Sequence, residues 1–373
     1  MNDLLSDTMR NRAEGVGRPL VDLDAVMKSG ERRRKRRGAL VVAGAAAVCA
    51  IVGVGAVQVA GTSDGAEAPG YAGKSSFVER KPTYATGSTI HYGNQQIDVD
   101  TKIHAFIQTD DGFVLGDPRG AVLFADGESV QEIGDSRKES PLVADESGSY
   151  AAWVDNTNDG PPEFVVYDTS TLTEVVRTSE GNRPGKDAVV GGHPRVIAVD
   201  GDRVYVRNAR GLARIDIPSG HSELLRPGVD EDAEIVDVED GLRLRRIFTG
   251  NPDLGESEPP GVIVRGQSGE SLVVAGGRDL SPGAHYVTSD ATDSEQIYDT
   301  RTGDEVVLDT EEYGFQFVTR WIDADTAVVG VLKDPDAANP EISMLTCELP
   351  SGECEVAADD LPSNIKLPTG DSR

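Results

Sequence analysis

The sequence predicts an all-β fold, and three observations support this prediction. A hairpin pattern, IYDTRTGDEVVL at residues 297–308, recurs in FVVYDTSTLTEVV, ARIDIPSGHSELL and MLTCELPSGECEV. Short runs of β-branched and apolar residues flank each turn, as is typical of strands. The turn residues, which are separated by 34 to 49 positions, are Gly93, Gly127, Leu172, Gly220, Gly269, Gly303 and Gly352. Strand-rich repeats of about 40 to 50 residues are typical of β-propeller blades.

Seven hairpins predict a β-propeller of seven blades, and the alternative is six blades with an added hairpin. Each unit supplies further strands upstream of its hairpin, so the hairpin is the outer edge of a blade. In one unit these strands are 194–200, 203–208, 212–217 and 222–227. The Gly93 hairpin is expected to close the ring with the C-terminal strand. Leu172 stands where a turn glycine is usual, which predicts a turn of different shape there.

One segment resembles a repeat element of known propellers. Residues 279–287, DLSPGAHYV, resemble the L-S-P-D-G-x-x-V element of Tol-type and WD-like propeller repeats, with Gly283 and Ala284 where Asp and Gly are usual. The chain has no W-D dipeptide and no S-x-D-x-G-x-x-W motif. The resemblance implies an extracytoplasmic propeller of this repeat type and leaves the named family open.

A transmembrane α-helix is predicted at residues 38–60. The nineteen residues from Ala39 to Val57 carry no charge, and about 20 such residues span the hydrocarbon core of a bilayer. Six basic residues at 32–37 precede them, and positive flanks stay in the cytoplasm. The chain is therefore expected to pass once through the cell membrane, with its N-terminus in the cytoplasm and its C-terminal domain outside. A cleaved signal peptide is disfavoured by the 37 preceding residues, and a lipoprotein at Cys49 by Val48.

Residues 1–37 are predicted to be a largely disordered cytoplasmic tail, because their two short apolar patches cannot bury a core. The tail could lie near anionic lipid or dock on a cytoplasmic partner. It resembles the short tails of actinobacterial membrane proteins tied to extracytoplasmic-function sigma factors, and this resemblance implies such a partner. No His or Cys precedes Cys49, so no zinc site is expected there.

Residues 61–88 are predicted to be a flexible linker, because they are rich in Gly, Ala, Ser and Pro. Residues 89–373 are assigned to the extracytoplasmic propeller. The net charge of the chain is -28, although residues 1–37 contain ten basic and six acidic residues. Such acidity argues against a nucleic-acid partner, which requires a basic surface.

Cys347 and Cys354 flank the tight LPSGE turn and are predicted to form a disulfide outside the membrane. The closed loop is short, so its entropic contribution is about 2 kcal/mol. The alternative is a pair of free, packed thiols.

No catalytic residue and no cofactor can be assigned from the sequence. The five histidines are scattered, and neither H-E-x-x-H nor G-x-S-x-G occurs; they are His91, His104, His193, His221 and His285. The segment DNTNDG offers Asp155 and Asp159 as a calcium site, against the alternative of a plain Asx-rich turn.

A group of arginines stands out in this acidic domain: Arg203, Arg207, Arg210, Arg214, Arg243, Arg245 and Arg246. In LRLRRIF, strand alternation predicts that Arg243 and Arg245 lie on one face. We therefore take Arg207, Arg210, Arg243 and Arg245 as candidate residues for binding an anionic ligand. The alternative is that the arginines pair with nearby carboxylates.

The predicted function is that of a binding or sensing module for a protein or a cell-envelope ligand, held at the lipid bilayer by residues 38–60. The alternative is a hydrolase or lyase with its site in the central channel of the propeller, since propellers include both enzymes and scaffolds. A cluster of carboxylates or histidines converging at one mouth of that channel would favour the enzyme, whereas an apolar or basic rim without such a cluster would favour the binding module.

Overall fold

The computed structural model describes residues 77–136, 140–145, 148–157, 160–182, 194–227, 234–247, 261–265, 271–275, 277–290, 294–338 and 340–370. All of them belong to one compact unit, Glu67–Arg373. The predicted cytoplasmic tail, the transmembrane helix at 38–60 and most of the linker lie outside the described residues. Within these ranges, the chain forms no helix of the length and apolar character that crossing a bilayer requires.

The described residues form six four-stranded antiparallel sheets, which we call blades 1 to 6, and one three-stranded sheet. The three-stranded sheet consists of β1 (Thr83–Thr86), β2 (Thr89–Tyr92) and β3 (Gln95–Asp98). Blade 1 consists of β4 (Ala105–Gln108), β5 (Phe113–Gly116), β6 (Ala121–Ala125) and β7 (Val130–Asp135). Blade 2 consists of β8 (Val143–Ala144), β9 (Tyr150–Asp155), β10 (Glu163–Asp168) and β11 (Thr173–Thr178).

The other four blades repeat this order along the chain. Blade 3 consists of β12 (Arg195–Asp200), β13 (Arg203–Asn208), β14 (Gly211–Asp216) and β15 (Ser222–Pro227). Blade 4 consists of β16 (Glu234–Glu239), β17 (Leu242–Ile247), β18 (Gly261–Arg265) and β19 (Ser271–Ala275). Blade 5 consists of β20 (Gly277–Leu280), β21 (Tyr286–Ser289), β22 (Gln296–Asp299) and β23 (Glu305–Val306). Blade 6 consists of β24 (Phe315–Asp323), β25 (Thr326–Leu332), β26 (Ile342–Glu348) and β27 (Cys354–Leu361).

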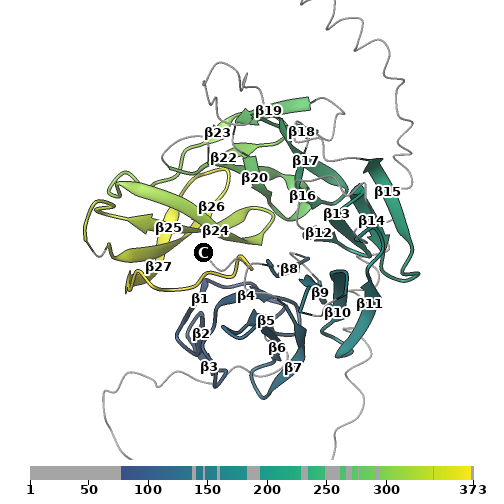
Figure 1. The fold of residues 1–373 in the computed structure, drawn as a ribbon. Helices are drawn as coiled ribbons and strands as arrows, with labels where there is room; N and C mark the ends of the chain where they lie inside the picture. The colour runs from purple at the N-terminus through teal and green to yellow at the C-terminus, as the bar shows by residue number, and fades with distance from the viewer. Residues whose placement is uncertain are drawn as a thin grey trace, which may run out of the picture. The chain divides into compact units, whose positions relative to one another are not determined.

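The fold is an all-β propeller with six four-stranded blades (Figure 1). This corrects the expected number of seven blades and agrees with the alternative of six. The hairpin at Gly93 belongs to the smaller sheet β1–β3. That sheet is joined to the C-terminal segment by a single bridge, in which Ala85 and Lys366 exchange hydrogen bonds of 2.8 and 2.9 Å. The predicted closure with C-terminal residues therefore occurs at this sheet.

The folded domain begins before residue 89, which corrects the boundary of the predicted linker. Strand β1 lies inside residues 61–88, and Phe77 is fully buried against Tyr92 and Phe113, with ring centroids 5.4 and 5.2 Å away. The burial of this aromatic ring stabilises the fold. The composition of residues 61–88 could not predict this contact, because the partner residues are distant in sequence.

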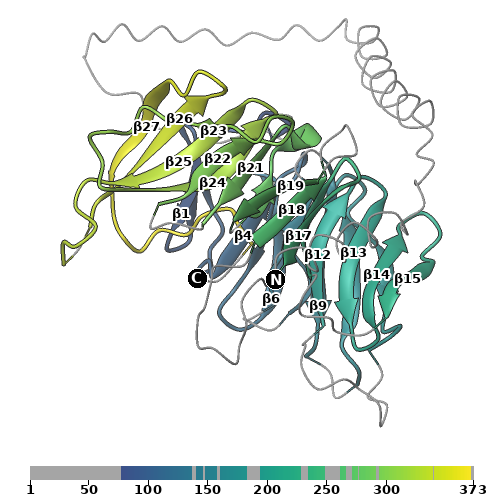
Figure 2. The ribbon, with the colours of Figure 1, turned by 90° about the horizontal axis from the view of Figure 1, so that it is seen from above.

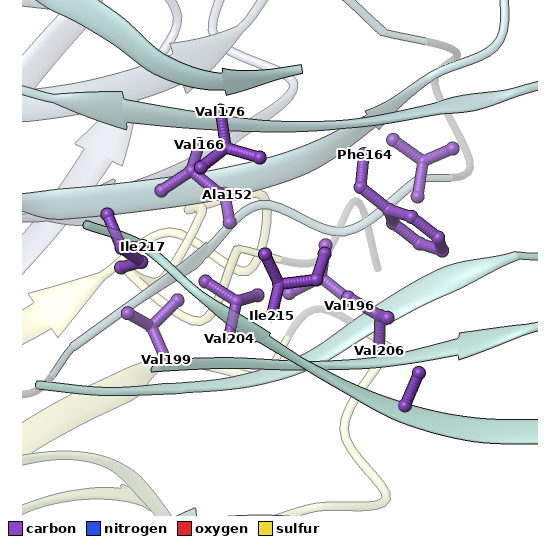
Figure 3. Packing of buried hydrophobic residues seen from close by; sticks show 12 residues of the cluster. Ala152, Phe164, Val166, Val176, Val196, Val199, Val204, Val206, Ile215 and Ile217 are labelled. Carbon is purple, nitrogen blue, oxygen red and sulfur yellow. The ribbon is translucent and has the colours of Figure 1, made fainter. Parts of the chain in front are cut away.

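Each blade buries both of its faces, because successive side chains of a strand point to opposite sides. Phe164 and Val166 of β10 pack against blade 3, whereas Val165 and Tyr167 pack against blade 1. Figure 3 shows the packing between blades 2 and 3, in which Val166 and Val176 face Val204 and Ile215. Apolar clusters of this kind join neighbouring blades, and no sheet could bury its faces alone. Figure 2 shows the sheets standing side by side.

A second type of contact joins blades through a carboxylate and a main-chain amide. The amide of Gly201 in blade 3 donates to Asp145 of blade 2 at 3.0 Å. The amide of Gly241 in blade 4 donates to Asp200 of blade 3 at 3.1 Å. The amide of Gly283 in blade 5 donates to Glu239 of blade 4 at 3.3 Å. An acidic residue at the end of an inner strand, or directly after it, thus holds the first turn of the next blade in three successive cases.

The predicted disulfide between Cys347 and Cys354 is confirmed, with directly opposed Cα atoms 4.1 Å apart. It joins β26 to β27, and Cys347 is fully buried among apolar residues of blades 5 and 6. The hairpin turn also contacts blade 5, since the amide of Asp309 donates to the carbonyl of Gly352 at 2.8 Å. The disulfide therefore ties a hairpin that also packs on its neighbour.

The backbone angle φ is positive at Leu172, as it is at the turn glycines. This corrects the expectation of a turn of different shape. Leu172 has a φ of 56°, and Gly220 at the same hairpin position of blade 3 has a φ of 66°. A side chain in this region costs about 1 to 2 kcal/mol. The surrounding strands β10 and β11 hold Leu172 in this conformation.

Replacing Leu172 with glycine should therefore stabilise the protein. Leu172 is 38% exposed, so only part of its burial is lost, and the substitution relieves the backbone strain. We expect Leu172→Gly to raise the free energy of unfolding by about 0.5 to 1 kcal/mol and Gly220→Ala to lower it by about 1 kcal/mol. Urea unfolding measures both, and a destabilised Leu172→Gly protein would contradict the assignment of strain.

Candidate functional site

The inner strands of the six blades surround a cavity of about 410 Å³, which we call the channel. Charged and polar side chains from different blades line it together with Pro368 and Thr369 of the C-terminal segment. The C-terminal segment is fixed there because Gly370 donates to the carbonyl of Phe106 at 2.9 Å and accepts from the amide of Leu142 at 3.0 Å. The channel is therefore polar and is partly walled by the end of the chain.

Glu295 joins blades 5 and 6 at the channel wall. Its carboxylate accepts from Nη1 of Arg278 at 2.5 Å and from the amide of Val318 at 2.5 Å. Burial raises the pKa of the Glu295 carboxyl, although Arg278 and the Val318 amide both favour the charged form. This acid binds main chain and arginine of its own protein, so its position is explained by its role between the blades.

Asp237 and Asp279 form a pair of carboxyl groups in the channel wall. Asp237 accepts from the amide of Leu280 in blade 5 at 2.8 Å and from the amide of Val238 at 2.7 Å. Burial raises the pKa of Asp237, although these two amides and a hydrogen bond to the side chain of Asp279 act to lower it. Both carboxyl groups line the channel.

Arg320 connects the last blade to the first across the channel. It is 9% exposed, and its Nη1 donates to the side-chain oxygen of Gln108 at 2.5 Å. The Nε2 of Gln108 donates in turn to the carbonyl of Phe77 at 2.9 Å. This arginine therefore stabilises the ring where its two ends meet.

Three of the predicted ligand-binding arginines face the same interface, between blades 3 and 4. Leu244 packs against Leu280 of blade 5, so its strand neighbours Arg243 and Arg245 lie on the opposite face, as the alternation predicted. The guanidinium of Arg243 lies 5.8 Å from the ring centroid of Tyr205 in blade 3. Arg207 lies two residues after Tyr205 on β13 and therefore shares its face.

Arg210, the fourth candidate, is exposed in the turn between β13 and β14, next to this interface. Arg214 belongs to an ion pair with Glu223 at 2.5 Å, and Arg203 lies opposite Asp216 in the strand register. For these two residues the alternative of pairing with carboxylates holds. The side chain of Arg246 lies outside the described part of the chain.

Two further arginines at this interface were missed from the sequence. Arg195 of β12 lies directly opposite Arg207, and Arg226 of β15 lies directly opposite Leu212, which itself is opposite Arg207. The residues were visible in the sequence, but their register was not. Irregularities between Val196 and Ala198 and between Leu212 and Ala213 shift the pairing by one residue.

The candidate calcium ligand Asp155 is occupied by its own protein. Its carboxylate accepts from Nη1 of Arg177 at 2.8 Å and from the hydroxyl of Thr157 at 2.7 Å. Burial alone would raise the pKa of Asp155, but these hydrogen bonds lower it. Asp159 lies outside the described residues. Among the residues that the structure describes, no three His, Cys, Asp or Glu side chains are grouped to hold a metal ion.

The fold is that of known β-propellers, although no known protein family and no curated protein matches the sequence. The β-propeller domain of the Trilobed protease from Pyrococcus furiosus, with an open velcro topology, has a TM-score of 0.50 and 13% identity over 73% of this chain and 86% of that one. A quinonprotein alcohol dehydrogenase-like protein from Bacteroides thetaiotaomicron has a TM-score of 0.43 and 11% identity, over 78% and 79% of the two chains.

TolB from Acinetobacter baumannii has a TM-score of 0.36 and 14% identity over 68% of this chain. The match covers 62% of TolB, so this chain spans less than two thirds of its length. At 13% identity the likeness to the Trilobed protease domain shows the β-propeller fold and carries nothing about activity.

Glu295→Gln and Asp155→Asn should have opposite effects on the pH dependence of stability. Because the pKa of Glu295 is raised on folding, wild type should gain stability over Glu295→Gln as the pH falls from 7 toward the ordinary value of 4.5. Because the pKa of Asp155 is lowered, wild type should lose its advantage over Asp155→Asn as the pH falls below 3.8. Urea unfolding across this pH range measures both differences, and equal pH trends for the two variants would contradict the assignments.

Proposed function

We propose that the protein is a membrane-anchored, extracytoplasmic β-propeller that binds a protein or cell-envelope ligand. The observation that supports this most is the gathering of Arg207, Arg243 and Arg245 at one interface between blades, with Arg210 in the adjacent turn. In a chain of net charge -28, such a group brings several positive charges together in one region. Arginine is well suited to this role, because its planar fork binds carboxylate and phosphate groups through two hydrogen bonds.

The predicted anchor gives this binding a location. Residues 38–60 would hold the propeller at the outer face of the lipid bilayer, and residues 1–37 would remain in the cytoplasm. The tail could then report the state of the propeller to a cytoplasmic partner, which would make the protein a sensor.

A crosslinking experiment in intact cells tests the location and the binding together. Single cysteines at Arg210→Cys and Arg119→Cys, in a Cys49→Ser background, are labelled with a membrane-impermeant benzophenone maleimide. Arg119 is the matched control, because its side chain is 83% exposed and belongs to blade 1. We expect both positions to be labelled, and light to produce a crosslinked adduct from Arg210→Cys only. Labelling that requires cell lysis would contradict the location, and equal adducts from both positions would contradict the site.

A second candidate function is that of a hydrolase or lyase, and the carboxyl pair of Asp237 and Asp279 supports it. Burial raises the pKa of Asp237, and a carboxyl group with a raised pKa in a cavity is typical of a general acid or base. Against it, Asp237 accepts the main-chain amide of Leu280 in blade 5, and Asp145 and Glu239 likewise accept an amide of the next blade. We therefore rank it second.

Asp279→Asn distinguishes the two roles of this pair. If the pair is catalytic, wild type should release p-nitrophenol from at least one member of a panel of p-nitrophenyl glycosides and esters. Asp279→Asn should then lower that rate by about 100-fold or more, with the thermal midpoint little changed. Equal rates for wild type and Asp279→Asn would exclude the enzyme role for this pair.

A further inference from the structure

We infer that the edge of the interface between blades 3 and 4, where partly exposed arginines lie at the ends of their strands, binds a linear polyanion along a row of these arginines. We call this site the arginine row. It consists of Arg195, Arg207 and Arg226, which come from the first, second and fourth strands of blade 3. This inference rests on the proposed binding function and specifies the class of its ligand. The ligand is a non-peptide polymer that carries an anionic group on each repeating unit.

The strand register places these three residues on one line across the blade. Arg195 pairs with Arg207, Arg207 with Leu212, and Leu212 with Arg226. Residues directly opposite each other share a face of the sheet, so all three side chains leave blade 3 on the same side. That side faces blade 4, because Leu212 belongs to the apolar cluster that joins these two blades.

The spacing of the row indicates an extended ligand. Neighbouring strands lie about 5 Å apart, so the row spans about 15 Å from β12 on the inside of the ring to β15 on the outside (Figure 1). Arg195 also lines the channel, so the row begins at the channel wall. A single small anion could contact only one or two of these positions, whereas a polymer could contact all of them.

The facing blade adds positive charge to the same interface. Arg243 and Arg245 of β17 lie on the face that is turned toward blade 3, and Arg243 is held over the ring of Tyr205. The opposed pair of Arg195 and Arg207 is itself unfavourable, because like charges directly across two strands repel each other. Each arginine of the row also makes an interaction within the protein.

An acidic protein segment matches the row less well than a flexible polyanion. In an extended peptide, side chains on the same side are about 7 Å apart, whereas the arginines of the row are about 5 and 10 Å apart. A polymer with a charge on every unit of a flexible backbone can reach each guanidinium without a fixed repeat. Phosphate polymers and uronate polymers share this chemistry, and the experiment separates them.

Binding of the full chain to long-chain inorganic polyphosphate and to polygalacturonate should be measured at several NaCl concentrations, with inorganic phosphate and poly-L-glutamate for comparison. We expect at least one of the two polyanions to bind much more tightly than inorganic phosphate. Arg207→Gln and Arg226→Gln should each weaken that binding about tenfold. Each should also reduce the slope of log affinity against log salt concentration by about one. Arg207→Lys keeps the charge but loses the planar guanidinium group that donates two hydrogen bonds, so it should have an intermediate effect.

Arg203→Gln is the matched control, because Arg203 lies on the same strand and face as Arg207 but at the other end, opposite Asp216. It should change the affinity less than twofold, and a thermal midpoint close to wild type shows that each variant is folded. Polyanion binding that is unaffected by Arg207→Gln and Arg226→Gln would overturn the inference.

Two other outcomes separate this inference from the proposed function. If poly-L-glutamate binds more tightly than both polyanions, with the same arginine dependence, the ligand is an acidic protein segment; the inference fails and the proposed function stands. If wild type binds none of the polymers, the inference fails, and the crosslinking at Arg210 then decides the proposed function independently.

Discussion

The structure depends on one constraint, which is that every sheet must have both of its faces covered by neighbouring sheets. Val165 and Val166 are adjacent on β10 and are both fully buried, yet they pack against different blades. A single antiparallel sheet with two apolar faces is not stable in water, so each blade requires the next one. The ends of the ring must meet for the same reason, and the small sheet β1–β3 meets the C-terminal segment at Ala85 and Lys366.

The same constraint explains where the charged groups lie. A buried face leaves little room for unpaired polar atoms, and the carboxylates near the channel accept amides or arginines from the neighbouring blade. Asp145 and Glu239 hold the first turn of the next blade, and Glu295 connects blade 5 to blade 6. The arginines between blades 3 and 4 differ, because cations from both blades meet there. This contrast makes that interface the better candidate for recognition of a ligand.

The sequence predicted features that depend on neighbouring residues. The hairpins, the four strands of blade 3 and the bridge between Cys347 and Cys354 are local, and all of them were confirmed. The common face of Arg243 and Arg245 followed from strand alternation alone. Leu172 was misjudged because tertiary packing can hold a leucine in a conformation that local preference disfavours.

Features that depend on distant contacts could not be predicted. The blade count required knowing that the Gly93 hairpin belongs to a three-stranded sheet, and the domain boundary required the contact of Phe77 with Phe113. The places of Arg195 and Arg226 required the strand register, which bulges shift by one residue. The membrane anchor and the cytoplasmic tail remain predictions from hydropathy and charge.

Native-state hydrogen exchange of the full chain tests the central claim, which is that mutual burial makes the closed ring a single cooperative unit. The amides to follow are those of Ala85 in the small sheet, Val206 in blade 3 and Val329 in blade 6, measured at increasing denaturant. All three should converge on one free energy of opening. A separate, much lower value for Ala85 would contradict it, because the small sheet would then open while the six blades stayed folded.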